Sequence, residues 1–327
     1  MPAEPRTYRG RILVIRGGAI GDFILTLPAF AALRHQFPDA YLEVLGYPHI
    51  AQLAVAGGLV DHAQSIEARS LAGFFARNGD LSEDLAHYFS DFDLIISYLY
   101  DPDEIFRTNV GRCTPAQFIQ GPHRPEPGCR VPAAEVYLQP LQRLAILEAD
   151  PVPKLHIGPC AGAVSGATFW PGGEPPLKPV LALHPGSGSE DKNWPEARWA
   201  KLLESVVNGT GFNLLLVGGE AEGRRLQRLA AALPPTRTRV AQSLPLARLA
   251  ALLSQCEGFI GHDSGISHLA AALGLPGLVL WAETDEFIWR PPSPSIMLIR
   301  SPAGLSRLPV ETVFARLLEV WGARCPG

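Results

Sequence analysis

The sequence predicts an α/β protein of two doubly wound domains, each built on a parallel sheet that helices cover on both faces. Short, continuous apolar runs alternate with longer helical patterns along both halves of the chain, and strands buried on both faces have this composition. A stretch rich in Pro and Gly, residues 151–179, separates the two series and has the composition of a linker. The length of 327 residues corresponds to about two domains of ordinary size. We therefore expect one domain over residues 1–150 and another over 180–327.

The first series opens with a short strand followed by a long apolar helix. Strands are expected at 12–15, 41–45 and 93–98, with weaker candidates at 63–67 and 118–121, and helices at 20–36, 50–56, 71–90 and 133–148. The helix at 20–36 is apolar on more than one face, through Phe23, Ile24, Leu25, Leu27, Phe30 and Leu33. This pattern favours a buried core helix over one that faces lipid.

The second series repeats the scheme. Strands are expected at 180–184, 212–217, 238–241, 258–261, 277–281 and 296–300, and helices at 196–208, 220–233, 246–256, 267–273 and 310–321. In open α/β sheets a ligand sits beyond the carboxyl ends of the strands. The loops that follow the strands are therefore the places to search for function.

Composition excludes several classes of protein. The formal net charge of −4 argues against a general nucleic-acid binder, which needs a basic face. Residues 1–150 carry six more acidic than basic side chains and the rest carry two more basic than acidic, so the second half is the better place for an anionic ligand. The five Cys are scattered without C-x-x-C spacing, which predicts neither a zinc site nor a disulfide framework. The longest apolar run has 14 residues, too few for a membrane span, and no signal peptide is evident, so a cytoplasmic protein is expected.

The first polar motif, Arg16-Gly-Gly-Ala-Ile-Gly-Asp22, follows the first strand and opens a helix. Gly18 and Gly21 would let the backbone approach a ligand, and the helix N-terminus offers N–H groups. The spacing is neither a dinucleotide fingerprint nor a P-loop. Asp22 has two interpretations: it pairs with the helix dipole, or it is a carboxylate base at the floor of a ligand site.

The second motif is the loop His184-Pro-Gly-Ser-Gly-Ser-Glu-Asp-Lys-Asn-Trp-Pro195, which follows the strand at 180–184. Ser187, Ser189 and Lys192 form a plausible diphosphate cradle with the loop's N–H groups. The alternative is a solvated loop that carries a surface lysine.

Two further motifs lie after later strands. Glu222, in Gly-Gly-Glu-Ala-Glu (218–222), is a candidate for holding ribose hydroxyls, or it simply favours a helix start. In the stretch 261–268, Asp263, Ser264, Gly265 and His268 precede and open a helix whose N–H groups could hold a phosphate. The stretch fits neither a metal site nor a hydrolase nucleophile elbow, and a helix cap with a packed histidine is its structural alternative.

Together and in this order, these motifs resemble glycosyltransferase family 9, the heptosyltransferases of lipopolysaccharide core assembly. The matching residues are ILVIRGGAIGDFILTLPAF (12–30), HPGSGSEDKNWPEARWAKL (184–202), LLLVGGEAE (214–222) and FIGHDSGISHLAAALGLP (259–276). The resemblance implies a GT-B fold, in which two Rossmann-like domains face a cleft. It also implies an inverting, metal-independent transfer without a cofactor, from a nucleotide diphosphate donor, typically ADP-heptose, to a glycolipid or glycan acceptor of the inner core.

The resemblance also assigns roles to single residues. Asp22 matches the general base, Lys192 the contact to the donor phosphates, and Glu222 the acid that holds the ribose. Asp263, Ser264, Gly265 and His268 match the donor-sugar and diphosphate motif. An enzyme of this kind would work in the cytoplasm, in peripheral contact with the inner face of the cytoplasmic membrane.

Two other functions remain open on the sequence. A nucleotide-sugar epimerase or hydrolase on a similar scaffold would bind the same donor without a separate acceptor, and a non-catalytic protein would only bind the nucleotide sugar. The segment 61–130 matches no particular heptosyltransferase, so the acceptor is undefined. We expect no nucleic-acid partner.

Overall fold

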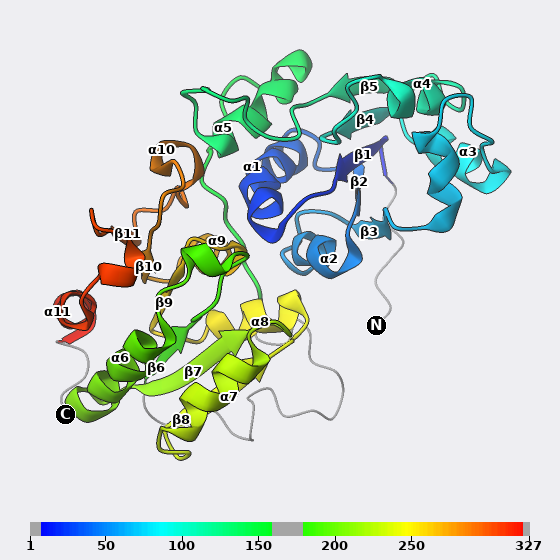
Figure 1. The fold of residues 1–327 in the computed structure, drawn as a ribbon. Helices are drawn as coiled ribbons and strands as arrows, with labels where there is room; N and C mark the ends of the chain where they lie inside the picture. Colours follow the sequence, from blue (N-terminus) through cyan, green and yellow to red (C-terminus); the bar gives the residue numbers. More distant parts are fainter. Residues whose placement is uncertain (1–7, 159–178, 323–327) are drawn as a thin grey trace. The chain divides into compact units, whose positions relative to one another are not determined.

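The computed structural model describes residues 8–158 and 179–322 and divides into two compact units, Met1–Pro153 and Lys154–Gly327 (Figure 1). Each unit has its own parallel sheet and its own buried core. The fold class predicted from the apolar runs is therefore confirmed: both units are doubly wound α/β layers.

The sheet of the first unit has five parallel strands in the order β3-β2-β1-β4-β5. Its strands are β1 (Arg11–Arg16), β2 (Tyr41–Gly46), β3 (His62–Ser65), β4 (Leu94–Ser97) and β5 (Gln117–Gln120). Its helices are α1 (Ile20–Gln36), α2 (Pro48–Ala56), α3 (Glu83–Ser90), α4 (Ile105–Gly111) and α5 (Ala133–Leu138), with 3₁₀ helices η1 (Arg69–Phe75) and η2 (Gln139–Leu144). Because β1 lies between β2 and β4, the chain leaves it toward one edge and later returns to the other side.

The central strand β1 is buried on both faces, as its apolar run predicts. Leu13 and Ile15 pack in a cluster with side chains of α3 and α4, including Phe89 and Phe106. Alternation turns Ile12 toward the opposite face, and α1 contacts both α2 and α5. Helix α1 is buried over most of its length, so it is the core helix that its two-sided apolar pattern favours.

Two expected helices of the first unit are interrupted in the structure. The helix expected at 71–90 is instead η1 and α3, because Asn78 adopts a positive φ of 51° and Asn109 donates hydrogen bonds to the carbonyls of Phe74 and Ala76. The helix expected at 133–148 ends as an α-helix at Leu138 and continues as η2, where Pro140 lacks the N–H that an α-helix needs.

The second unit has six parallel strands in the order β11-β10-β9-β6-β7-β8. They are β6 (Val180–Leu183), β7 (Asn213–Gly218), β8 (Thr238–Gln242), β9 (Gly258–His262), β10 (Gly277–Leu280) and β11 (Ile296–Ile299). The helices are α6 (Glu196–Gly209), α7 (Gly223–Ala231), α8 (Leu246–Leu253), α9 (Gly265–Ala272), α10 (Glu286–Trp289) and α11 (Val310–Trp321), with 3₁₀ helices η3 (Glu190–Lys192) and η4 (Leu305–Arg307).

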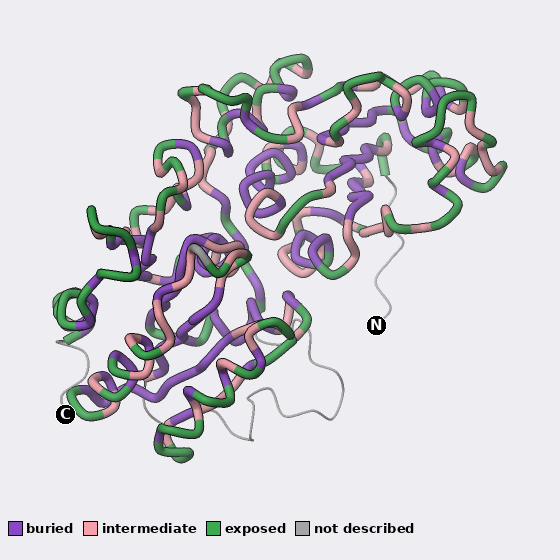
Figure 2. The backbone as a smooth tube through the Cα atoms, viewed as in Figure 1, coloured by how far each residue is buried: buried purple, intermediate pink, exposed green. Residues whose placement is uncertain are grey.

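Large aromatic side chains fill the core of the second unit on one face of its sheet. Trp194, Trp199 and Trp321 are almost fully buried there, with side chains of α6, α7 and α11 packed on the strands. Figure 2 shows the central strands of this sheet as buried segments, while helices α6, α7 and α11 carry exposed residues. A Cβ on Gly258 would come within 2.4 Å of the Trp321 indole, so this strand position requires glycine.

Strands β6 and β9 pair in parallel at the centre of this sheet. The chain winds from β6 toward β8 on one side and from β9 toward β11 on the other. This reversal is a topological switch point, where the loops after the two strands diverge and leave room for a ligand. Two of the polar motifs, 184–195 and 261–268, follow these two strands.

The Pro- and Gly-rich stretch expected as a linker is described only in part. Residues 151–158 form neither helix nor strand, and Leu155 is buried with its N–H donated to the carbonyl of Ala272 in the second unit. Residues 159–178 lie outside the described part of the chain. Within residues 8–158 and 179–322, no helix has both the length and the apolar composition needed to cross a membrane.

Candidate nucleotide-sugar site

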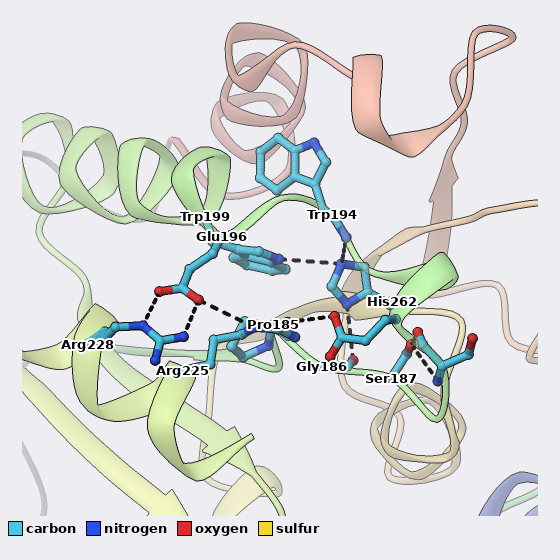
Figure 3. Close-up of polar contacts among 11 residues, drawn as sticks. Pro185, Gly186, Ser187, Trp194, Glu196, Trp199, Arg225, Arg228 and His262 are labelled. Atoms are coloured by element: carbon cyan, nitrogen blue, oxygen red, sulfur yellow. Dashed lines mark hydrogen bonds and ion pairs between the residues drawn. The ribbon is translucent and has the colours of Figure 1, made fainter. Parts of the chain in front are cut away.

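The loop after β6, residues 184–195, is hydrogen-bonded to His262. This histidine is the last residue of β9 and is fully buried. Its Nε2 accepts hydrogen bonds from the Trp194 backbone N–H at 2.8 Å and from Trp199 Nε1 at 3.4 Å, while Nδ1 lies 3.0 Å from the carbonyl of Gly186 (Figure 3). Because Nε2 accepts, we infer that Nδ1 carries the proton and donates to that carbonyl. Burial lowers the pKa of His262 to about 4, so the ring is neutral near pH 7. His262 therefore fixes both ends of the loop.

A second set of contacts fixes the same loop from helix α7. Arg225 donates to the carbonyl of Pro185 at 3.2 Å and to Glu190 at 2.8 Å. Glu196, at the start of α6, receives a bidentate pair of hydrogen bonds from Arg228 at 2.7 and 2.6 Å (Figure 3). These hydrogen bonds lower the pKa of Glu190 and that of Glu196. Arg225 thus holds the loop, and Arg228 holds the start of the helix that follows it.

The Glu222 side chain lies next to Gly186, which follows β6, and Gly219, which follows β7. Its Oε2 accepts a hydrogen bond from the N–H of Gly219 at 2.9 Å. A Cβ on Gly186 would come within 2.3 Å of Glu222 Cγ, so the glycine makes room for this carboxylate. Glu222 is partly exposed and directly precedes α7.

Three strand ends meet at Asp263. Its Oδ2 accepts from Lys192 Nζ at 2.7 Å and also from the hydroxyl of Thr284. These residues follow β9, β6 and β10, which are separated along the chain but adjacent in the sheet. The Asp263 side chain is 8% exposed and that of Lys192 is 37% exposed. A buried carboxylate therefore holds the ammonium group of a lysine whose side chain remains partly exposed.

Helix α9 begins beside this ion pair. Ser264 is extended and precedes the helix, and its hydroxyl lies 3.3 Å from Nδ1 of the buried His184. Burial, followed by the nearby His262, lowers the pKa of His184 to about 3. Gly265 opens the helix and His268 is buried in its first turn. The first N–H groups of α9 are of the kind that bind anions at helix starts.

The two serines of this loop lie in different surroundings. The Ser187 hydroxyl donates to the carbonyl of Ser189 at 2.6 Å and accepts from the Ser189 N–H at 3.3 Å. Ser187 therefore closes a turn within its own loop. Ser189 lines a cavity of about 1370 Å³ together with Lys192, Asn193, Trp281, Thr284 and the segment 300–306.

The first unit carries a separate polar cluster at the end of β1. Asp22 lies in the first turn of α1, where Gly21 precedes it and Gly18 adopts a positive φ of 99°. The Asp22 side chain is 28% exposed. Its Oδ1 accepts from the Tyr137 hydroxyl at 3.1 Å and lies 3.9 Å from the guanidinium of Arg16. Asp22 thus stands at the start of α1 and also bonds to a side chain of α5.

The structure brings most of the predicted donor residues to one edge of one sheet. Lys192, Asp263, Ser264, Gly265 and His268 follow β6 and β9, and Glu222 follows the neighbouring β7. Asp22, Gly18 and Gly21 belong to the other unit. Sequence reasoning missed Thr284, Arg225 and Tyr137, which lie outside the motifs. Within residues 8–158 and 179–322, no three His, Cys, Asp or Glu side chains gather as a metal site.

Comparison with known structures defines the class of the fold. The structure of the ADP-heptose lipopolysaccharide heptosyltransferase II of Escherichia coli superimposes with a TM-score of 0.75, covering 96% of this chain and 99% of that one at 17% identity. The fold is therefore that of the GT-B glycosyltransferases. Residues 166–310 match the family model described as glycosyltransferase family 9 (heptosyltransferase). The matched residues are less than half of the chain and include three of the four motifs that carry the resemblance to this family, so the resemblance is confirmed there.

Two curated relatives have sequences similar to this chain. Lipopolysaccharide heptosyltransferase 1 of Pseudomonas aeruginosa is 36% identical over 110 residues, which cover 34% of this chain and 30% of that protein. Lipopolysaccharide heptosyltransferase 3 of Escherichia coli is 22% identical over 296 residues, covering 83% of each chain. The chain thus matches less than a third of the length of the Pseudomonas protein.

Proposed function

We propose that this protein transfers heptose from ADP-heptose to a saccharide of the lipopolysaccharide core, with inversion and without a metal ion. The observation that carries the proposal is the ion pair of Lys192 and Asp263 beside the start of α9, at the switch point of the second sheet. An open ammonium and a helix N-terminus, side by side, favour a bound diphosphate. Relatives named as lipopolysaccharide heptosyltransferases supply the substrate class.

In this proposal the second unit binds the donor. Lys192 and the first N–H groups of α9 contact the diphosphate, and Ser189 contributes a hydroxyl from the cavity wall. Glu222 accepts hydrogen bonds from the ribose hydroxyls, as acidic residues at such turns do. The lysine replaces part of the charge stabilisation that a divalent cation supplies in other transferases.

In the first unit, Asp22 removes the proton from the acceptor hydroxyl. The hydroxyl oxygen then forms a bond to the anomeric carbon of heptose, while the bond from that carbon to the β-phosphate oxygen breaks. ADP departs with the electron pair of the broken bond, and Lys192 and the α9 N–H groups stabilise the negative charge that develops on it. A single displacement inverts the configuration at the anomeric carbon.

The acceptor places the enzyme at a membrane surface. Lipopolysaccharide precursors are amphiphilic and nucleotide sugars are water-soluble, so we propose a cytoplasmic enzyme in peripheral contact with the inner face of the cytoplasmic membrane. This part of the proposal predicts that the protein floats with vesicles containing the acceptor and is released by salt without detergent.

The donor is tested by calorimetry with ADP-, GDP- and UDP-sugars. We expect ADP-heptose to bind with the highest affinity, unchanged in EDTA. Tighter binding of a GDP- or UDP-sugar, or loss of binding in EDTA, would contradict the proposed donor or its metal independence. Conversion of ADP-heptose at the same rate with and without heptose-deficient lipopolysaccharide would instead indicate the epimerase or hydrolase, and binding without any turnover would indicate a binding protein.

A further inference from the structure

The carboxylate of Asp22 is held by a residue far away in the sequence. Tyr137, in α5, directs its hydroxyl to Asp22 Oδ1 at 3.1 Å. Burial raises the pKa of Tyr137 to about 12, so the phenol keeps its proton near neutral pH and donates. The bond joins α5 to the first turn of α1, and these two helices pack against each other.

Arg16 lies next to both partners of this hydrogen bond, Tyr137 and Asp22. Its side chain is 2% exposed, and its guanidinium lies over the ring of Tyr137, 4.4 Å from the centroid. It donates to the carbonyl of His123 at 2.8 Å and to the carbonyl of Asp22 at 3.2 Å. The Tyr137 ring is thus fixed on one face by a cation that is itself tied to two backbone carbonyls.

The two carboxylate oxygens of Asp22 face different surroundings. Oδ1 faces Tyr137 and Arg16. Oδ2 lies on the side of Gly18, where a Cβ would stand 3.6 Å from it. The Asp22 side chain keeps 28% of its surface exposed, and no side chain of Gly18 stands beside Oδ2.

We propose that Tyr137 is a positioning residue: its hydroxyl, backed by Arg16, anchors Oδ1 so that Oδ2 of Asp22 points at the acceptor hydroxyl. This inference rests on the proposed function, in which Asp22 is the base. The Asp22 carboxylate can turn about both the Cα–Cβ and the Cβ–Cγ bonds, so it needs such an anchor, because a misplaced reacting group loses much of its catalytic advantage. Tyr137 touches neither the proton nor the sugar and acts through Asp22.

Tyr98 provides a matched control. It is a buried tyrosine of the same cluster, packed edge-to-face on Tyr137 with centroids 6.1 Å apart. Its hydroxyl donates to the backbone carbonyl of Tyr137 at 2.7 Å. Tyr98→Phe therefore removes a buried hydroxyl and its hydrogen bond, as Tyr137→Phe does, without removing a donor to Asp22.

The experiment is a double-mutant cycle on the rate of heptose transfer from ADP-heptose to heptose-deficient lipopolysaccharide. We expect Tyr137→Phe to lower kcat by about 10- to 100-fold, with KM for ADP-heptose nearly unchanged. In the Asp22→Asn background the same change should lower kcat no further, because Tyr137 acts only through the carboxylate. Tyr98→Phe should lower the melting temperature and leave kcat within about twofold.

Several results would overturn the inference. Losses in kcat that multiply in the double variant would show that Tyr137 acts independently of Asp22, and an equal loss in Tyr98→Phe would show a merely structural effect. If Tyr137→Phe does not fold, Tyr137→Met fills the same space without a donor and carries the same expectations. Wild-type turnover in Asp22→Asn would remove the base itself and so refute the proposed mechanism, whereas an inactive Asp22→Asn with an unaffected Tyr137→Phe would refute only the positioning role.

Discussion

Replacing Lys192 by methionine tests the proposed diphosphate site at the lysine that Asp263 holds. The variant removes the ammonium that Asp263 holds at 2.7 Å and keeps most of the aliphatic stem. A hydrogen bond to a charged group contributes about 1.5–3 kcal/mol, which corresponds to roughly 10- to 150-fold in affinity. Because the variant also leaves the Asp263 carboxylate facing an anionic ligand, we expect a loss of ADP affinity near the upper part of this range.

The assay is isothermal titration calorimetry with ADP and, in parallel, with adenosine. Adenosine lacks the diphosphate, so its affinity should be the same in wild type and Lys192→Met. The control variant is Lys201→Met, which changes an exposed lysine of α6. Adding Asp263→Asn to Lys192→Met should restore part of the ADP affinity, because it removes the repelling carboxylate. Equal ADP affinity in the Lys192 and Lys201 variants would refute the assignment of the diphosphate to this ion pair.

Two further predictions concern the loop after β6. Gly186→Ala should displace Glu222, because the new Cβ would lie 2.3 Å from Glu222 Cγ, and should weaken the binding of both ADP and adenosine by about 5- to 10-fold. Gly188→Ala is the control, since a Cβ at that position would have no atom within 4 Å. Equal effects of the two variants would contradict the reasoning. Stability should fall with decreasing pH between about 6.5 and 4, because the pKa of His262 is lowered to about 4 and the unfolded chain binds a proton there that the folded one does not. This stability is present in full above pH 6.5, and roughly 3 kcal/mol of it is lost by pH 4, at about 1.36 kcal/mol per pKa unit. Denaturation curves of His262→Gln should therefore show a shallower pH dependence than wild type, and parallel curves would contradict the reasoning.

The strands were predictable because each strand of a parallel sheet that is buried on both faces appears in the sequence as a short continuous apolar run. The predicted runs at 12–15 and 180–184 coincide with β1 and β6 to within one residue at either end. The short helices α4 and α10 escaped prediction, since seven and four residues are too few to show a helical period. The break between η1 and α3 depends on Asn109, whose hydrogen bonds cross more than 30 residues of chain.

The candidate site was predictable in outline because its motifs follow neighbouring strands, but its pairings were not. The ion pair of Lys192 with Asp263 spans 71 residues and the bond of Tyr137 to Asp22 spans 115, and both depend on the order of strands and helices in space. His262 stands in a motif rich in reactive residue types, yet both of its ring nitrogens are bonded within the protein. Only the structure separates such a supporting histidine from one that contacts a ligand.

The most direct test of the account is transfer of ¹³C-labelled heptose from ADP-heptose to heptose-deficient lipopolysaccharide in EDTA, by wild type and by Asp22→Asn. Asparagine retains the size of the side chain and much of its ability to serve a helix start, but it cannot take the acceptor proton. We expect labelled lipopolysaccharide of inverted anomeric configuration from wild type, and a rate about 10²–10⁴-fold lower from Asp22→Asn, with ADP affinity within a few fold. Wild-type rates from Asp22→Asn, or no labelled lipopolysaccharide from either protein, would contradict the account.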